Sequence, residues 1–256
     1  MEKRKPIAHQ AKPGKSQFIK GIRPVMEALD AGREIEKVLI QQGLTGDTVK
    51  ELRSELSARH VPVQSVPVEK LNRVTRSNHQ GVIAFMSGIS YASLDHMISS
   101  VFERGQSPRV IILDRISDVR NFGAIARTAE VLGFDAIIIP QRGSAMINDD
   151  AMKTSAGALN HIPVCRETDL PVTVRYLREC GIEVIACTEK AQESLYSIDL
   201  KGPVALMFGS EEDGISPALI KAADKLVRIP MKGKVASLNV SVSVAIAAAE
   251  VMRQNS

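Results

Sequence analysis

The sequence is poor in aromatic residues and in cysteine. It has no tryptophan, three tyrosines and six phenylalanines, together 4% of its 256 residues, which argues against an RNA-binding surface that stacks bases on exposed rings. The three cysteines, Cys165, Cys180 and Cys187, show no CxxC spacing. The sequence therefore indicates neither a disulfide framework nor a zinc knuckle, and we expect buried or partly buried thiols.

Signals for membranes, metals and common nucleotide sites are also missing. No apolar run approaches the roughly 18 residues of a membrane span, and no signal-peptide pattern opens the chain, so we expect a cytoplasmic protein. GxGxxG and HExxH do not occur, and the five histidines are scattered, which leaves a metal ion without a candidate ligand set. The segment from Gly209 to Gly214 has the glycine spacing of a phosphate loop, but Ile215 stands where that loop has lysine.

Positive charge is concentrated in the front part of the chain. Residues 1–88 contain 15 Lys and Arg against 9 Asp and Glu, whereas residues 89–256 contain 18 against 20, and the whole chain has a net charge of +4. A basic front segment suits a polyanionic partner such as RNA better than a membrane. Ordinary solvated lysines and arginines would explain the charge equally well.

Apolar strands that alternate with helices predict two α/β domains. Residues 1–16 are basic and nearly free of apolar residues, as expected for a flexible arm, and residues 17–88 are predicted to form a compact sandwich. Residues 89–107 lack a strong strand signal and are expected to be a linker. From 108 to 256 the pattern is typical of a parallel sheet covered on both faces, in which ligands bind beyond the carboxyl ends of the strands. The loops after Leu113, Phe208 and Ile229 therefore form the candidate site.

Three segments at these strand ends, residues 118–129, 205–217 and 229–244, carry the candidate polar residues Asn121, Arg127, Glu211, Ser237 and Asn239. Taken singly, Asn121 and Ser237 could be helix N-caps, Glu211 could belong to a solvated acidic loop, and Arg127 could be a surface arginine. Asn239 lies in a helix otherwise rich in Val and Ala, where a buried amide would need a hydrogen-bond partner.

The segments NFGAIARTA, LMFGSEEDGIS and IPMKGKVASLNVSVSVAIA resemble, in order and spacing, the three signature motifs of SpoU-type (TrmH-like) RNA ribose methyltransferases of the SPOUT superfamily. The front segment, FIKGIRPVMEAL through SNHQGVIAFM, is similar to the L30e-like substrate-binding domain of bacterial 23S rRNA guanosine methyltransferases. The resemblance implies an α/β fold with two parts. A small L30e-like α/β/α RNA-binding domain over 17–88 precedes a parallel-sheet SPOUT domain over 108–256, which is tied at its C-terminal end into a trefoil knot.

The resemblance also implies an activity, the transfer of a methyl group from S-adenosylmethionine to a ribose 2′-OH of RNA. It places cofactor contacts at Gly209, Ile229 and Leu238, and at the main chain around Thr188, Met207 and Met231.

The resemblance gives Arg127 the central catalytic role, with Asn121, Glu211, Ser237 and Asn239 orienting it and the ribose. Because arginine has a pKa above about 12 and is a poor base at neutral pH, we expect Arg127 to hold the adjacent phosphate and to stabilise the developing alkoxide.

Members of this family dimerise through the knotted domain, with the Asn and Arg of the first motif reaching the partner's cofactor pocket, so we expect a homodimer. The final Val/Ala-rich helix could supply that interface or lie wholly in the core. Because tRNA-modifying members often lack the front domain, we expect a guanosine of 23S rRNA as the substrate, gripped mainly through lysines and arginines of that domain. A tRNA substrate, or a catalytically silent RNA-binding assembly factor, are the alternatives.

Overall fold

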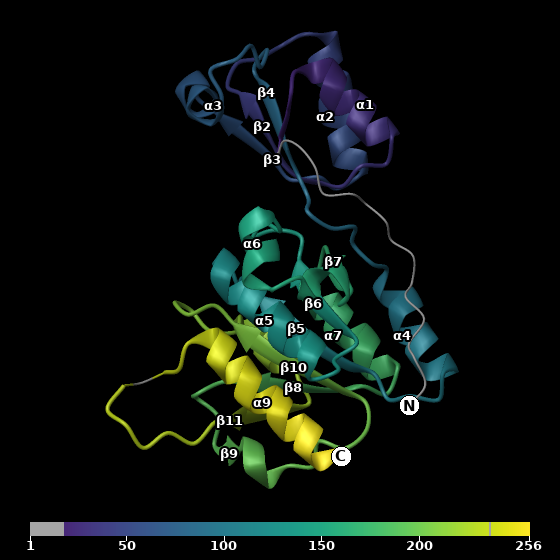
Figure 1. Cartoon of the computed structure of the whole chain (residues 1–256), viewed down its shortest axis with the longest axis vertical. Helices are drawn as coiled ribbons and strands as arrows, with labels where there is room; N and C mark the ends of the chain where they lie inside the picture. Colours follow the sequence, from purple (N-terminus) through teal and green to yellow (C-terminus); the bar gives the residue numbers. More distant parts are fainter. Residues whose placement is uncertain (1–17, 236) are drawn as a thin grey trace. The chain divides into compact units, whose positions relative to one another are not determined.

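The computed structural model describes residues 18–235 and 237–256. The basic arm expected over residues 1–16 lies outside this range. The described chain forms two compact units that divide between Ile89 and Ser90 (Figure 1). In the part that the structure describes, no helix is both long and apolar enough to cross a membrane.

The first unit is a four-stranded sheet with helices on both faces (Figure 1). Its elements are β1 (Phe18–Lys20), α1 (Ile22–Asp30), β2 (Ile35–Gln41), α2 (Asp47–Ala58), β3 (Val63–Val66), α3 (Val68–Val74) and β4 (Val82–Met86). The strand order is β1-β4-β2-β3, with β2 and β3 parallel and the other pairs antiparallel. Helices α1 and α2 pack on one face of the sheet, and the seven-residue α3 packs on the other.

The second unit is a seven-stranded sheet in which all the strand pairs of the described residues are parallel, in the order β7-β6-β5-β10-β8-β11-β9. Its strands are β5 (Arg109–Asp114), β6 (Ala136–Pro140), β7 (Val164–Glu167), β8 (Glu183–Cys187), β9 (Glu193–Ser194), β10 (Val204–Gly209) and β11 (Lys225–Arg228). Its α-helices are α4 (Leu94–Glu103), α5 (Val119–Val131), α6 (Asp149–Thr154), α7 (Leu170–Glu179), α8 (Pro217–Ala222) and α9 (Val240–Gln254). The prediction of a parallel-sheet α/β domain behind a small α/β domain is confirmed.

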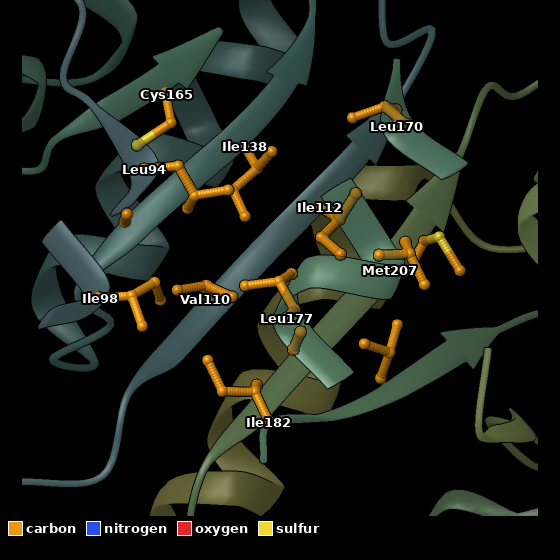
Figure 2. Packing of buried hydrophobic residues seen from close by; sticks show 14 of the residues in the cluster. Leu94, Ile98, Val110, Ile112, Ile138, Cys165, Leu170, Leu177, Ile182 and Met207 are labelled. Atoms are coloured by element: carbon orange, nitrogen blue, oxygen red, sulfur yellow. The ribbon is translucent and has the colours of Figure 1, made fainter. Parts of the chain in front are cut away.

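Both faces of this sheet are buried, which explains why its strands are apolar along their whole length. Val110 and Ile112 of β5 pack with α4 and α7 in one core cluster, part of which is shown in Figure 2. Ile111 and Leu113 alternate with them and are equally buried, so they point to the opposite face. Helices α5 and α9 contact each other, and α9 also contacts β10 on that face.

Residues 89–107, expected to be a linker, are largely helical in the structure. Leu94, Ile98 and Val101 of α4 are buried in the core of the second unit, and Tyr176 of α7 donates a 2.8 Å hydrogen bond to Asp95. The spacing of these apolar residues, three and four apart, is typical of an amphipathic helix, and the expectation of a linker here is wrong. The second unit therefore begins before residue 108.

The order of the strands brings the three candidate loops to one edge of the sheet. Gly209 at the end of β10 is in register with Asp114 at the end of β5, and Val227 of β11 is in register with Cys187 of β8. Because all these strands run in the same direction, the segments that follow them leave the sheet at the same edge. The predicted location of the candidate site, beyond Leu113, Phe208 and Ile229, agrees with this topology.

Candidate functional site

Asn121, Glu211 and Asn239 form a closed ring of side-chain hydrogen bonds, although each comes from a different segment. Asn239 Nδ2 donates to Glu211 Oε1 at 2.8 Å and to Asn121 Oδ1 at 3.0 Å, and Asn121 Nδ2 donates to Glu211 Oε1 at 3.0 Å. One carboxylate oxygen thus accepts two amide N–H bonds. These bonds join the start of α5, the loop after β10 and the start of α9 at the candidate edge.

Backbone capping fixes the direction in which Asn239 presents its amide. Its Oδ1 accepts from the backbone N–H of Ser241 at 2.9 Å and from Ser241 Oγ at 2.5 Å, so Nδ2 must face Glu211 and Asn121. Asn239 is therefore the N-cap of α9 as well as a member of the ring. The helix expected from Ser237 begins at Val240, because the capping side chain is that of Asn239.

A second cap sets the position of Asn121. Asp118 Oδ1 accepts from the backbone N–H groups of Arg120 and Asn121, at 2.9 Å and 2.8 Å. The cap of α5 is therefore Asp118, and the alternative interpretation of Asn121 as an N-cap does not hold. Farther along α5, Gly123 packs against α6, where an added Cβ would lie 2.7 Å from Thr154 Cβ. Glycine at position 123 therefore allows α6 to approach α5 closely.

The loop that carries Glu211 folds back onto Gly209. A Cβ added at Gly209 would lie 2.0 Å from the carbonyl carbon of Gly214 and 2.1 Å from the backbone nitrogen of Ile215. The loop is closed by a 2.9 Å hydrogen bond from Gly214 N to Ser210 O. Only glycine fits at position 209, because the atoms that a side chain would meet belong to the backbone.

Arg115 fastens the same loop to the end of β5. Its guanidinium donates to Asp213 Oδ2 at 3.0 Å, to Gly214 O at 3.1 Å and to Asp114 Oδ1 at 3.2 Å. The hydrogen bond with Asp114 raises the pKa of Arg115. Asp114 is buried, and its Oδ2 also accepts from Ser216 N at 2.7 Å. Sequence patterns did not predict this network, and its one local signal is the charged pair Asp114 and Arg115 at the end of an apolar strand.

Two of the expected catalytic residues lie outside the ring. Arg127 is exposed on α5, six residues after Asn121 and therefore about 120° away around the helix. It makes no hydrogen bond or ion pair with the described residues. Ser237 is also exposed, and it makes no hydrogen bond within the described part of the chain. Arg127 is thus free to bind a partner from outside its own chain.

The residues expected to hold the cofactor lie along the same edge, with one exception. Thr188 and Ile229 directly follow β8 and β11, and Thr188 N donates to Val227 O at 2.8 Å. Met231 and Leu238 are exposed in the segment between β11 and α9. Met207 lies two residues inside β10, with its side chain in the core cluster (Figure 2) and with β5 and β8 on its two sides.

The chemistry of this edge fits an adenine-containing cofactor better than a metal. Within residues 18–235 and 237–256, no group of three or more His, Cys, Asp or Glu side chains could hold a metal ion. Four large apolar side chains are instead exposed in and beside the segment between β11 and α9, namely Met231, Val235, Leu238 and Val242. Apolar side chains beside strand-end backbone groups are what a flat, partly apolar ligand requires.

The cysteines take no part in the site. Cys165 is buried in the core cluster, and Cys180 and Cys187 are partly buried, as expected. Burial raises the pKa of Cys165 and that of Cys187 to about 12. These two thiols are therefore protonated at neutral pH and are poor nucleophiles.

Comparison with known families covers nearly all of the described chain. Residues 108–249 match the SpoU rRNA Methylase family, and residues 18–92 match the family described as RNA 2′-O ribose methyltransferase substrate binding. The chain is 33% identical over 237 residues to a Bacillus subtilis (strain 168) protein named putative TrmH family tRNA/rRNA methyltransferase YacO. That match spans 93% of this chain and 95% of the relative.

Solved structures show the same likeness. An AdoMet-bound rRNA methyltransferase from Sinorhizobium meliloti is 27% identical, with a TM-score of 0.58, and the match covers 92% of this chain and 86% of that one. A structure described as giving insights into the 2-OH methylation of C/U34 on tRNA is 26% identical, with a TM-score of 0.53. It covers 58% of this chain and 96% of its own.

Proposed function

Because this chain belongs to the SpoU rRNA methylase family and is an S-adenosylmethionine-dependent RNA 2′-O-methyltransferase, we propose that its substrate is a guanosine of 23S rRNA. The observation that favours rRNA is the fraction of this chain that each of two solved structures covers. The rRNA methyltransferase from Sinorhizobium meliloti matches 92% of this chain, whereas the structure concerned with tRNA matches 58%. An enzyme that keeps the front unit resembles the former.

Within the site, Arg127 holds the phosphate next to the target ribose and stabilises the alkoxide that develops at its 2′ oxygen. S-adenosylmethionine would supply the methyl group and leave as S-adenosylhomocysteine, and the 2′-OH proton is released to solvent. Support for this role is the exposed guanidinium of Arg127, which no described residue engages. The ring of Asn121, Glu211 and Asn239 keeps the loop after β10 and the start of α9 in place, and Ser237 completes the ribose side of the site.

Gly209, Thr188 and Ile229 would hold the cofactor at the strand ends through their backbone groups. Met231 and Leu238 pack against its adenine, which accounts for two apolar side chains that are otherwise exposed. Met207 supports Gly209 from inside the sheet. A contact of Met207 with the cofactor would use its main chain, since its side chain is fully buried.

We also propose that the protein is a homodimer and that its C-terminal chain is knotted. A homodimer formed through the second unit would cover Val235 and Val242, and it would bring Arg127 of one protomer to the pocket of the other. The C-terminal segment forms a trefoil knot, as expected for the family to which the chain belongs. A crystal structure of the holoenzyme with an unthreaded C-terminal segment would contradict the knot.

Mapping of ribose methylation in 23S rRNA and tRNA, from cells with and without the gene, tests the substrate. A missing 2′-O-methyl group at one guanosine of 23S rRNA is expected, and a loss confined to tRNA would contradict the proposal. The purified Arg127→Lys variant tests the role of the guanidinium, because lysine keeps the charge but not the planar pair of donors. Near-normal turnover of that variant would argue against a geometric role for Arg127.

Mixing two inactive variants tests the proposed dimer. If Arg127 acts across the interface, a mixture of Arg127→Ala with Glu211→Ala should regain activity, since a mixed dimer holds one site with both residues intact. Either variant alone should stay inactive. A mixture that remains inactive, although co-purification of differently tagged chains shows that mixed dimers have formed, would place Arg127 in the site of its own chain.

A further inference from the structure

The face of the first unit that α3 covers incompletely holds a row of aromatic and basic side chains. Phe85 of β4 lies in register with Phe18 of β1 on one side and with Lys37 of β2 on the other. The rings of Phe18 and Phe85 are 6.3 Å apart at a tilt of 57°, and Lys37 Nζ lies 5.2 Å from the centre of the Phe85 ring. All three side chains are partly exposed.

Two more lysines border this row. Lys20 is in register with Ile83 on the same face, and its Nζ donates to Ser77 Oγ at 2.6 Å. Lys70 of α3 donates to Gln64 Oε1 at 3.4 Å. We call Phe18, Phe85, Lys20, Lys37 and Lys70 together the basic aromatic face.

The basic aromatic face keeps its positive charge unneutralised. Within the described residues, none of its three lysines forms an ion pair with a carboxylate. Burial and the nearby charge of Lys70 lower the pKa of Lys37, and they outweigh the opposite effect of Glu36. Two like charges held close together cost free energy, which a bound polyanion would recover.

The short length of α3 explains why the row is accessible. Its seven residues cover Leu39, Val66 and Ile83, which form a small cluster with Leu71. Phe18 and Phe85 pack against the edge of this cluster and remain partly exposed. Part of each ring is exposed beside lysines that form no ion pair, so a ligand that covered the row would bury further apolar surface.

Base-stacking rings beside phosphate-binding lysines are the chemistry that recognises an unpaired nucleic-acid strand. We propose that the basic aromatic face is where an unpaired segment of the RNA substrate docks, with a base against Phe18 and Phe85 and the phosphates against the lysines. This inference rests on the proposed function and adds to it the form of RNA that the first unit recognises. It also revises the expectation, drawn from composition, that this protein has no stacking surface, because two of its six phenylalanines lie together here.

The test measures binding of the full chain to a fluorescent single-stranded oligoribonucleotide and to the same strand paired with its complement. The variant Phe18→Leu/Phe85→Leu keeps apolar packing but removes both rings, and single-strand affinity should fall about 5- to 150-fold. Phe85→Tyr keeps a ring in place and should retain most of the affinity. Thermal unfolding of each variant shows whether the first unit still folds.

Charge variants separate the lysines from the rings. Lys37→Gln/Lys70→Gln should reduce the slope of log affinity against log salt by about 1.4, if each lysine contacts one phosphate of a single strand. The phenylalanine variant should leave that slope unchanged. The matched control is Lys50→Gln/Arg53→Gln, which removes two charges from α2 on the opposite face of the sheet and should have a smaller effect.

Several outcomes would overturn the inference. These are unchanged single-strand binding by Phe18→Leu/Phe85→Leu, equal losses in the control, duplex RNA bound as tightly as the single strand, or polyglutamate bound as tightly as RNA. Methyl transfer to 23S rRNA by the unmodified protein, measured in parallel, separates this inference from the proposed function. Methyl transfer to 23S rRNA without binding that depends on the two rings would contradict this inference alone. Binding that depends on the rings, without methyl transfer to 23S rRNA, would contradict only the proposed function.

Discussion

Replacement of Asn239 by aspartate should break the ring at the candidate site while sparing the helix cap. The aspartate keeps an oxygen to accept from Ser241 N, so α9 retains its cap. Its second oxygen, however, would lie where Nδ2 now donates, 2.8 Å from Glu211 Oε1. A donor facing a carboxylate is thereby replaced by a second negative charge, with almost no change in shape.

The distance sets the size of the effect. Two unit charges 2.8 Å apart repel by roughly 1.5 kcal/mol at the dielectric constant of water and by roughly four times that at an effective value of 20. Because Glu211 and Asn239 are exposed, the lower figure applies. The lost amide bonds add about 1 kcal/mol. Asn239→Asp should therefore be about 2–3 kcal/mol less stable than the unmodified protein at pH 8, and should lose most of its methyl transfer.

The dependence on pH distinguishes repulsion from the mere loss of a side chain. A pair of adjacent carboxylates takes up a proton more readily in the folded protein than after unfolding, so the stability of Asn239→Asp relative to the unmodified protein should rise as pH falls below about 5. Asn239→Ala has no such pair, and its deficit should stay constant. Urea unfolding at pH 8 and pH 4.5 measures the free energy of unfolding of each variant. Transfer of a radiolabelled methyl group to RNA, at each pH at which RNA binds, measures the loss of activity. A deficit of Asn239→Asp that is small at pH 8, or that does not change with pH, would refute the reasoning.

Three other substitutions test the surroundings of the site. Gly209→Ala should displace the loop that carries Glu211 and weaken S-adenosylmethionine binding at least tenfold by calorimetry. The control Gly202→Ala also strains the backbone, because Gly202 has a φ of 87°, but no atom lies within 4 Å of its new Cβ and cofactor affinity should not change. Equal affinities of the two variants would contradict the close packing at Gly209. Arg115→Gln should raise KM for the cofactor severalfold and change stability by under about 1 kcal/mol, since the arginine is 38% exposed. A larger loss of stability without a change in KM would show that Arg115 acts on the fold alone. Hydrogen bonds from Arg253 and Gln254 hold the pKa of Glu250 at about 2, so its contribution to stability is present above the ordinary value of about 4.5 and is lost as pH falls toward 2. The unfolding free energy of Glu250→Gln should therefore change less between pH 5 and pH 2 than that of the unmodified protein, and parallel curves would disprove this origin.

The sequence was enough to predict the fold class, the family and the edge of the sheet at which the candidate residues lie. Continuous apolar strands can be recognised from the sequence alone, because the pattern is local. Three long motifs in the family order identify the family, because secondary-structure propensity alone would not produce them. The sequence also identified Gly209, Asn121, Glu211 and Asn239 as candidates, because each is a residue type that the strand or helix beside it does not require. The sequence could not tell which of these residues touch one another.

Only the tertiary structure decided those contacts. Asn121, Glu211 and Asn239 are separated by up to 118 positions, and the insertion of β10 between β5 and β8 determines that they meet. The same is true of Arg115, whose partners come from a loop 98 and 99 positions away. The composition of the chain argued against a stacking surface, yet strand register placed Phe18 beside Phe85, because antiparallel pairing joins positions that the sequence keeps far apart.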